Sequence, residues 1–220
     1  SGSANRQSLC KDVLQKEKGK ITLQTMRKLL RTHEEGLEGK QFSRHSLKSV
    51  CMHGGFIFGD HTTGSYIVEL NEKRPTYLIT GASTPCLSLF KPYWMIDNEN
   101  FSFGEGEGEA ALAFWLKRER LHRAVLENKI PDLKSYFVER DNIENEVDNL
   151  LTEMIVDSVC ESELREIISS YLDKEEHLIE HTLGSITDPD SKGMIKGSLL
   201  YRRFWQKQSD RLFNSINGGL

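Results

Sequence analysis

The stretch HTTGSYIVEL, residues 61–70, decides the fold class because its second half has the period of a β-strand. From Ser65 to Leu70 the side chains alternate between two faces, as they do along a strand. The run TYLIT, 76–80, follows the turn-like sequence NEKRP. Two such runs on either side of a turn predict an antiparallel hairpin, with strands within 62–70 and 76–80. TYLIT is apolar on both faces, so we expect this part of the sheet to be covered.

Helical periodicity dominates the rest of the chain. Before the hairpin, LCKDVLQKEK (9–18) and ITLQTMRKLLRTH (21–33) repeat their apolar residues at helical spacing, and Thr22 can cap the second helix. A polar, glycine-containing loop is expected at 33–48. From about residue 108 to the end the period stays helical, and the apolar positions of 143–155 and 164–179 are expected to face inward. FGEGEGE at 103–109 is the expected hinge. The pattern predicts an α+β protein with a long helical C-terminal region.

Composition limits the classes of partner. The chain has 220 residues, 29 of them basic and 33 acidic, and its net charge of -4 gives it no electrostatic reason to bind nucleic acid or an anionic membrane. No window approaches the roughly 20 apolar residues of a membrane span. The four cysteines are scattered and form no CxxC pair, which favours reduced thiols in a cytoplasmic protein and predicts neither a metal site nor a cofactor.

Local motifs leave the chemistry open. Cys51 with His53 and His61 offers a thiol and a base, but no third group orients them, so a buried structural cysteine is favoured. The glycines of HGGFIFG, 53–59, lack the spacing of a phosphate-binding loop. Thr62 and Thr63 follow His61, and paired threonines more often satisfy backbone groups at the start of a strand than act in catalysis.

A wider set of residues carries a resemblance to a known family. The set comprises Thr62-Thr63-Gly64-Ser65, Thr80-Gly81, Pro85, Ser88 and Phe90-Lys91-Pro92-Tyr93, with GKITLQTMRKLLRTH upstream of them. Together these segments resemble the distal half of the secernin and dipeptidase group of N-terminal-nucleophile hydrolases. The resemblance covers residues from about 19 to 94, whereas the part after residue 105 is only generally similar.

The resemblance implies an αββα sandwich with antiparallel strands, in which an N-terminal cysteine attacks an amide and its own amino group is the base. The chain begins SGSANRQ, and Cys10 lies in a helix-like segment. We therefore expect residues 1–4 to be a cloning remnant, 5–104 the C-terminal part of the sandwich domain, and 105–220 a helical tail. An N-terminal Ser1 nucleophile is formally possible but less economical.

On this interpretation the chain holds no catalytic residue, and by itself should be inactive. Its partners would be the N-terminal half of the same protein, a small peptide or amide substrate and possible further copies of itself. Motif residues expected at the site wall are His61, Thr62, Thr63, Ser65, Thr80 and Lys91.

Lys91 has two interpretations. It could attract a substrate carboxylate, or it could be exposed while Phe90, Tyr93 and Trp94 pack the loop onto the sheet. The second interpretation is favoured. Two other functions stay open for the whole chain: a non-enzymatic, secernin-like interaction module, and part of an acyltransferase on the same scaffold.

Overall fold

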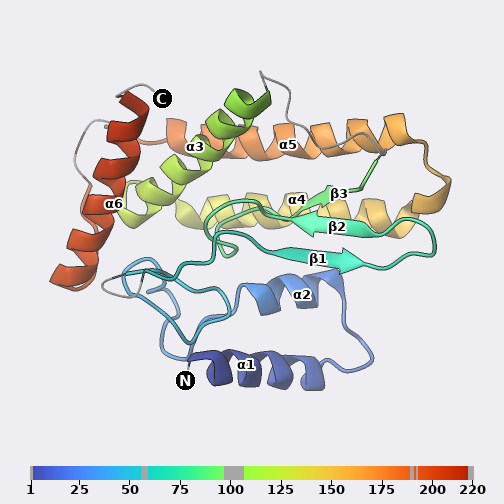
Figure 1. Cartoon of the computed structure of the whole chain (residues 1–220), viewed down its shortest axis with the longest axis horizontal. Helices are drawn as coiled ribbons and strands as arrows, with labels where there is room; N and C mark the ends of the chain where they lie inside the picture. The colour runs from blue at the N-terminus through green and yellow to red at the C-terminus, as the bar shows by residue number, and fades with distance from the viewer. Residues whose placement is uncertain (1, 56–58, 97–106, 189–190, 192, 218–220) are drawn as a thin grey trace.

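The structure is a computed structural model that describes residues 2–55, 59–96, 107–188, 191 and 193–217. Its described strands form one antiparallel sheet in the order β1-β2-β3, and helices lie above and below it in the view of Figure 1. The strands are β1 (Tyr66–Glu69), β2 (Thr76–Ile79) and β3 (Lys91–Tyr93). The helices are α1 (Gly2–Lys16), α2 (Leu23–Leu30), α3 (Glu107–Leu126), α4 (Leu133–Glu153), α5 (Glu161–Gly184) and α6 (Leu199–Asn217), with a 3-10 turn, η1 (Val156–Ser158), between α4 and α5. The predicted α+β class is confirmed.

The predicted hairpin is confirmed, but its first strand is shorter than expected. Tyr66 pairs with Ile79 and Glu69 with Thr76, so NEKRP lies within the connection. Thr62 is not part of the sheet because the Thr62 N–H donates to the Met52 carbonyl at 3.0 Å, and the Met52 N–H donates to Thr62 Oγ1 at 2.9 Å. These two hydrogen bonds hold the start of the stretch against another loop and leave β1 to begin at Tyr66.

Thr22 precedes α2 as the sequence indicates, whereas α1 begins at Gly2, earlier than the predicted stretch 9–18. Thr22 caps α2 through its side chain, which accepts a hydrogen bond from the Thr25 N–H. In return, the Thr22 N–H donates to Thr25 Oγ1. The expected loop at 33–48 contains no helix or strand. Of the expected hinge, residues 103–106 lie outside the described residues, and α3 begins at Glu107.

One hydrophobic core joins the sheet to the C-terminal helices. Ile67 and Leu78 from the sheet pack in the same cluster as Leu121 of α3, Val147 of α4 and Leu178 of α5. In Figure 1, α4 and α5 run along the sheet. The inward-facing positions expected between 164 and 179 are confirmed for the buried residues of α5.

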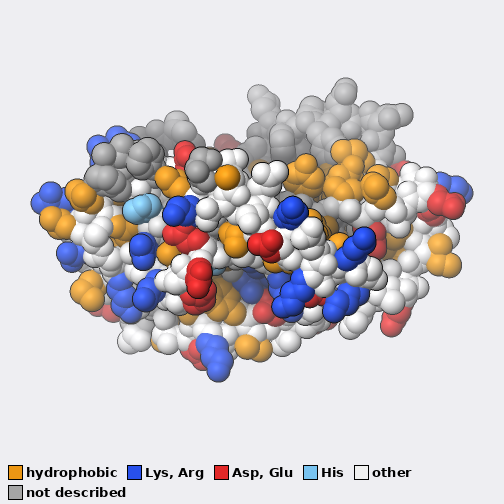
Figure 2. All heavy atoms as spheres, turned by 90° about the horizontal axis from the view of Figure 1, so that it is seen from below, with side chains coloured by type: hydrophobic (Ala, Val, Ile, Leu, Met, Phe, Trp, Pro, Cys, Tyr) orange, Lys and Arg blue, Asp and Glu red, His pale blue; other side chains and the backbone are white. Residues whose placement is uncertain are grey.

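Some expected apolar positions face solvent. Ile155 is 74 % exposed because it lies in the break between α4 and η1, where the helical face is interrupted. Acidic and basic side chains are interspersed on the face shown in Figure 2. Among the described helices, none is long and apolar enough to cross a membrane.

The two faces of the sheet differ in burial. Ile67 and Leu78 are partners in the β1–β2 register and lie on the face that is packed against the helices. Tyr66 lies on the opposite face and is 69 % exposed, and its partner Ile79 is only half-buried. Leu70, directly after β1, is 83 % exposed. At β1 and β2 the face that carries Tyr66 and Ile79 therefore leaves apolar side chains partly in solvent, whereas at β3 the same face carries Lys91, the partner of Ile79, which is buried.

Two leucines of the hairpin provide a matched test of this packing. Leu78→Ala removes a side chain with no exposed surface and should lower the free energy of unfolding by about 2–5 kcal/mol, because the cavity left behind collapses only partly. Leu70→Ala should change it by less than about 0.5 kcal/mol. Urea unfolding followed by circular dichroism measures both values, and equal effects would contradict the assigned faces.

Candidate functional site

Three of the residues expected at the site wall form one hydrogen-bonded unit. The Ser65 N–H donates to Thr80 Oγ1 at 2.9 Å, and the Thr80 N–H donates to the Ser65 carbonyl at 3.0 Å. Lys91 Nζ donates to the Thr80 carbonyl at 3.2 Å. Ser65, Thr80 and Lys91 are thus linked by hydrogen bonds, although 26 positions separate Ser65 from Lys91 in the sequence.

Lys91 is buried, which corrects the expectation that it is exposed. Its side chain is 5 % exposed, and Nζ lies 2.7 Å from Oε2 of Glu175, a buried residue of α5 that also binds Arg118. Phe90 and Trp94 pack as expected, with no exposed surface. Burial lowers the pKa of Lys91, while the Glu175 carboxylate opposes that shift.

The hydrogen bonds of Lys91 also argue against direct capture of a substrate carboxylate. An ammonium group has three N–H donors. Those of Lys91 have partners in Glu175, the Thr80 carbonyl and the Leu89 carbonyl. The side chain therefore acts inside the protein, where it ties β3 to α5.

His61, Thr62 and Thr63 do not converge as a catalytic set. His61 Nδ1 accepts a hydrogen bond from the Gly54 N–H at 2.9 Å, and its ring stacks on His122 of α3 with centroids 5.1 Å apart. Thr63 is exposed, and Thr62 binds the Met52 backbone. Burial, reinforced by the nearby His122 and His53, lowers the pKa of His61 to about 2, so this imidazole is neutral at physiological pH.

Four potential metal ligands meet in the interior of the protein. They are His33, Cys51, His53 and Cys86, and their ligand atoms all lie within 4.8 Å of one another. His53 Nε2 is 3.1 Å from His33 Nε2, 3.3 Å from Cys86 Sγ and 3.8 Å from Cys51 Sγ. We call these four residues the Cys/His cluster. His53 and both cysteines are buried, and His33 is half-buried.

The Cys/His cluster is built from three separate segments. His33 follows α2, and the neighbouring Thr32 carbonyl accepts a hydrogen bond from the Cys51 N–H at 3.1 Å. A bridge between Ser46 and His53 holds the second segment. Cys86 lies in the loop between β2 and β3. The sequence analysis paired Cys51 with His53, but it gave no sign that His33 and Cys86 join them, because those residues lie in distant segments.

The loop that carries Cys86 is held through four consecutive backbone carbonyls. Arg31 donates to the carbonyls of Pro85 and Ser88, each at 2.8 Å. Arg140 donates to the Cys86 carbonyl, and the Tyr136 hydroxyl donates to the Leu87 carbonyl at 2.7 Å. With its backbone fixed in this way, Cys86 keeps its place beside His53.

The Cys/His cluster does not have the features of an open catalytic thiol. Cys51 has no exposed surface, and a nucleophile must be reached by its substrate. Burial raises the pKa of the Cys51 thiol. Burial also disfavours the Cys86 thiolate, yet a hydrogen bond with Cys51 and the charge of His53 outweigh it and lower the pKa of Cys86. The arrangement suits the binding of a cation between fixed donors better than attack on a substrate.

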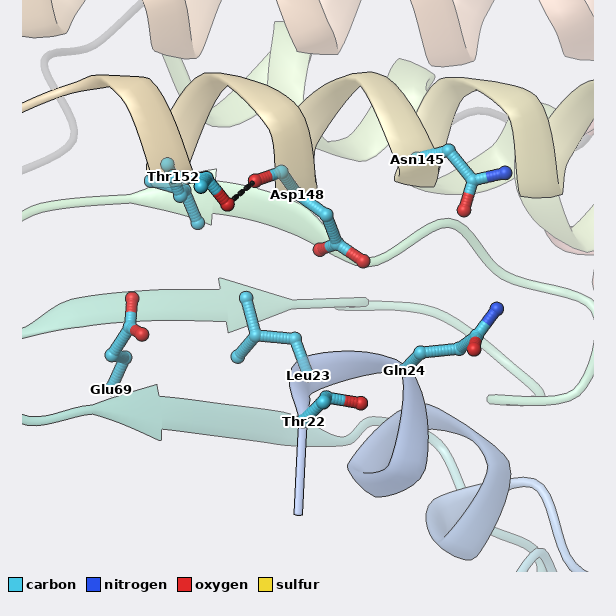
Figure 3. A pocket seen from close by; sticks show the side chains of 8 residues that line it. Thr22, Leu23, Gln24, Glu69, Asn145, Asp148 and Thr152 are labelled. Atoms are coloured by element: carbon cyan, nitrogen blue, oxygen red, sulfur yellow. Dashed lines mark hydrogen bonds between the residues drawn. The ribbon is translucent and has the colours of Figure 1, made fainter. Parts of the chain in front are cut away.

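A separate cleft lies between α2, β1 and α4 (Figure 3). Its volume is about 490 Å³, and Thr22, Gln24, Glu69 and Asp148 are among the side chains that line it. The Asp148 carboxylate, which lines this cleft, already accepts two hydrogen bonds from Arg27, at 2.6 and 2.7 Å. The cleft is lined by none of the residues expected at the site wall and by none of the Cys/His cluster.

Comparison of the chain with models of protein families, with curated proteins and with solved structures finds no match.

The buried ion pair can be tested by substitutions in α5. Glu175→Gln should lower the free energy of unfolding by about 3–5 kcal/mol, because Lys91 and Arg118 keep their charges in the interior while their shared carboxylate is lost. Glu180→Gln is the matched control, since that side chain is 56 % exposed and should have little effect. Chemical unfolding measures both, and equal effects would show that the buried pair is energetically unimportant.

The lowered pKa of His61 predicts that the protein loses stability in acid. Its folded pKa of about 2 lies below its ordinary value of 6.5, so below pH 6.5 the unfolded chain takes up a proton that the folded chain excludes. The free energy of unfolding should therefore fall as the pH falls, by about 1.4 kcal/mol per pH unit from this group. His61→Asn should reduce the slope measured between about pH 6 and about pH 5 by this amount. An unaltered slope would contradict the assignment, and His45→Asn, at an exposed position, is the control.

Proposed function

We propose that this chain is the C-terminal portion of a secernin-like peptide or amide hydrolase that works in the cytoplasm. The observation that carries the proposal is the uneven burial of the sheet. The face that carries Ile67 and Leu78 is buried, and at β1 and β2 the opposite face presents Tyr66, with Ile79 and Tyr77 half-buried beside it. A sandwich of the αββα type needs such a face, because a second sheet packs there.

The motif residues support the same proposal. The Ser65–Thr80 pair joins the start of β1 to the end of β2, and Lys91 ties β3 to the Thr80 carbonyl. Ser65 and Thr80 come directly next to the Tyr66–Ile79 pair, so their contact continues the register of the hairpin. In the proposed enzyme this unit fixes the rim of the sheet beside the substrate, and the residues act as supports for the site wall.

The four cysteines of the chain support a nucleophile supplied by another segment. Cys10 lies within α1, and Cys160 is exposed before the first turn of α5. Cys51 and Cys86 are enclosed in the Cys/His cluster. None combines an open position with a free amino group, which an N-terminal-nucleophile mechanism requires. The proposed catalytic cysteine therefore belongs to the N-terminal half of the parent enzyme.

Activity measurements test the catalytic side of this proposal. The purified chain should not hydrolyse a panel of dipeptides, whereas the product of the complete open reading frame should do so through a processed N-terminal cysteine. Replacing that cysteine by alanine should abolish turnover. Turnover by the chain alone that is lost in Cys51→Ala, or in a version lacking Ser1, would overturn the proposal. An inactive complete protein would instead favour the interaction module.

The sheet face gives a test that does not depend on activity. Tyr66→Asp should change the unfolding free energy of the chain alone by less than about 0.5 kcal/mol, because the position is exposed. In the complete protein the same change should be strongly destabilising, because it buries an unpaired charge under the second sheet. Met194→Asp, at a position 66 % exposed, should be mild in both proteins. Equal, small effects of Tyr66→Asp in both would show that no second sheet covers this face.

A further inference from the structure

We propose that the Cys/His cluster is a binding site for one transition-metal ion, with zinc as the best fit. The ligand set is His33, Cys51, His53 and Cys86, two imidazoles and two thiols. This donor set is one of those that hold structural zinc in proteins. The inference is independent of the hydrolase proposal, since it concerns a buried site that needs no substrate.

The distances between the donor atoms match those around a tetrahedral zinc ion. Bond lengths of about 2.0–2.1 Å to nitrogen and about 2.3 Å to sulfur place two nitrogens about 3.3 Å apart, and a nitrogen and a sulfur about 3.6 Å apart. The observed nitrogen–nitrogen distance is 3.1 Å, and the two nitrogen–sulfur distances from His53 are 3.3 and 3.8 Å. The three distances from His53 are thus close to the spacing that one central ion requires, and all four ligand atoms lie within 4.8 Å of one another.

Hydrogen bonding alone does not account for this arrangement. His53 Nε2 faces His33, Cys51 and Cys86 at once, but an imidazole nitrogen carries either one proton or one lone pair. It can therefore satisfy only one of the three neighbours well. A cation among the four groups could be bound by every donor atom together, because these atoms all lie within 4.8 Å of one another.

A disulfide is a weaker explanation of the same residues. A bond between Cys51 and Cys86 would use both sulfurs and leave the nitrogens of His33 and His53 facing each other at 3.1 Å. Both cysteines are free thiols in the structure. The convergence of two histidines on the thiols has no role in a disulfide and a direct role in a metal site.

The fourfold ligand set indicates a structural ion. Catalytic zinc keeps an open coordination position, whereas four protein ligands close the site. The ion would join the end of α2, the segment 51–53 and the loop between β2 and β3. The second segment continues into Gly54, whose carbonyl accepts a hydrogen bond from Trp205 Nε1 of α6 at 3.0 Å. The metal would therefore also fix the place where α6 docks.

Cobalt substitution tests the proposal on the full chain. The protein is reduced, stripped of metal with a chelator and titrated with Co²⁺. We expect one ion per chain, visible absorption bands of tetrahedral cobalt and a near-ultraviolet thiolate-to-cobalt band, all removed by one equivalent of Zn²⁺. Chelator should lower the melting temperature of the protein as purified, and Zn²⁺ should restore it.

Substitutions assign the ligands. Cys51→Ser and Cys86→Ser should each reduce the thiolate-to-cobalt band to about half, since each removes one of two sulfur ligands. His33→Asn, at a half-buried position, should keep that band but weaken Co²⁺ binding at least about tenfold. Cys10→Ser and Cys160→Ser are the matched controls and should bind as the original chain does. Circular dichroism shows which variants are folded.

Three results would overturn the proposal. The first is a reduced, folded chain that gives no tetrahedral cobalt spectrum. The second is a spectrum lost in Cys160→Ser and kept when Cys51 and Cys86 are both replaced. The third is a Cys51–Cys86 disulfide in the native protein whose reduction produces no metal binding. The first result needs no variant, so a variant that fails to fold does not block the test.

Discussion

The ion pair between Arg31 and Glu144 fixes the part of the structure on which the rest depends. Arg31 Nη2 lies 2.5 Å from Glu144 Oε1, and the same oxygen accepts the Phe90 N–H at 2.8 Å. Arg31 also holds the carbonyls of Pro85 and Ser88. One guanidinium and one carboxylate thus join α2, α4 and the loop between β2 and β3. Removing either partner would leave a desolvated charge, which typically costs about 3–5 kcal/mol.

The position of this pair explains why distant residues meet. Arg31 precedes His33 by two residues, and Pro85 directly precedes Cys86. Holding Arg31 against the Pro85 carbonyl therefore brings the first and last members of the Cys/His cluster together. On the other side of the same loop, Glu175 holds Lys91. The loop from Thr80 to Lys91 is thus held by polar contacts from α4, from α5 and from Arg31 at the end of α2.

Periodicity predicted most of the fold, because helices and the hairpin depend on local pattern. It did not predict β3, since KPY has three residues and a central proline, which lacks an N–H for a sheet ladder. The strand exists because Tyr93 pairs with Tyr77 and Pro92 with Leu78. Pairing of this kind is a tertiary effect and has no signal in the segment itself.

The candidate site was predicted only in part, because some of its contacts also join segments that are distant in the sequence. Ser65, Thr80 and Lys91 were singled out as motif residues, but the burial of Lys91 was missed. Its signal was Glu175, an acidic residue four positions after Tyr171 and three before Leu178, on the apolar face of α5. A carboxylate on such a face requires a buried cation. His33 and Cys86 had no comparable signal, because their partners come from other segments.

A metal ion would stabilise the region that regular structure stabilises least. Residues 31–55 contain no helix or strand apart from the Ser46–His53 bridge, so few ladder hydrogen bonds offset the entropy of ordering this segment. Closing it onto Cys86 by coordination would restrict the unfolded chain across a long loop. The same segment reaches α6 through Gly54 and the start of β1 through Met52 and Thr62. Ordering of the Cys/His cluster would therefore also order the start of β1 at the edge of the sheet. The proposed second sheet would pack on the face of this sheet that carries Tyr66.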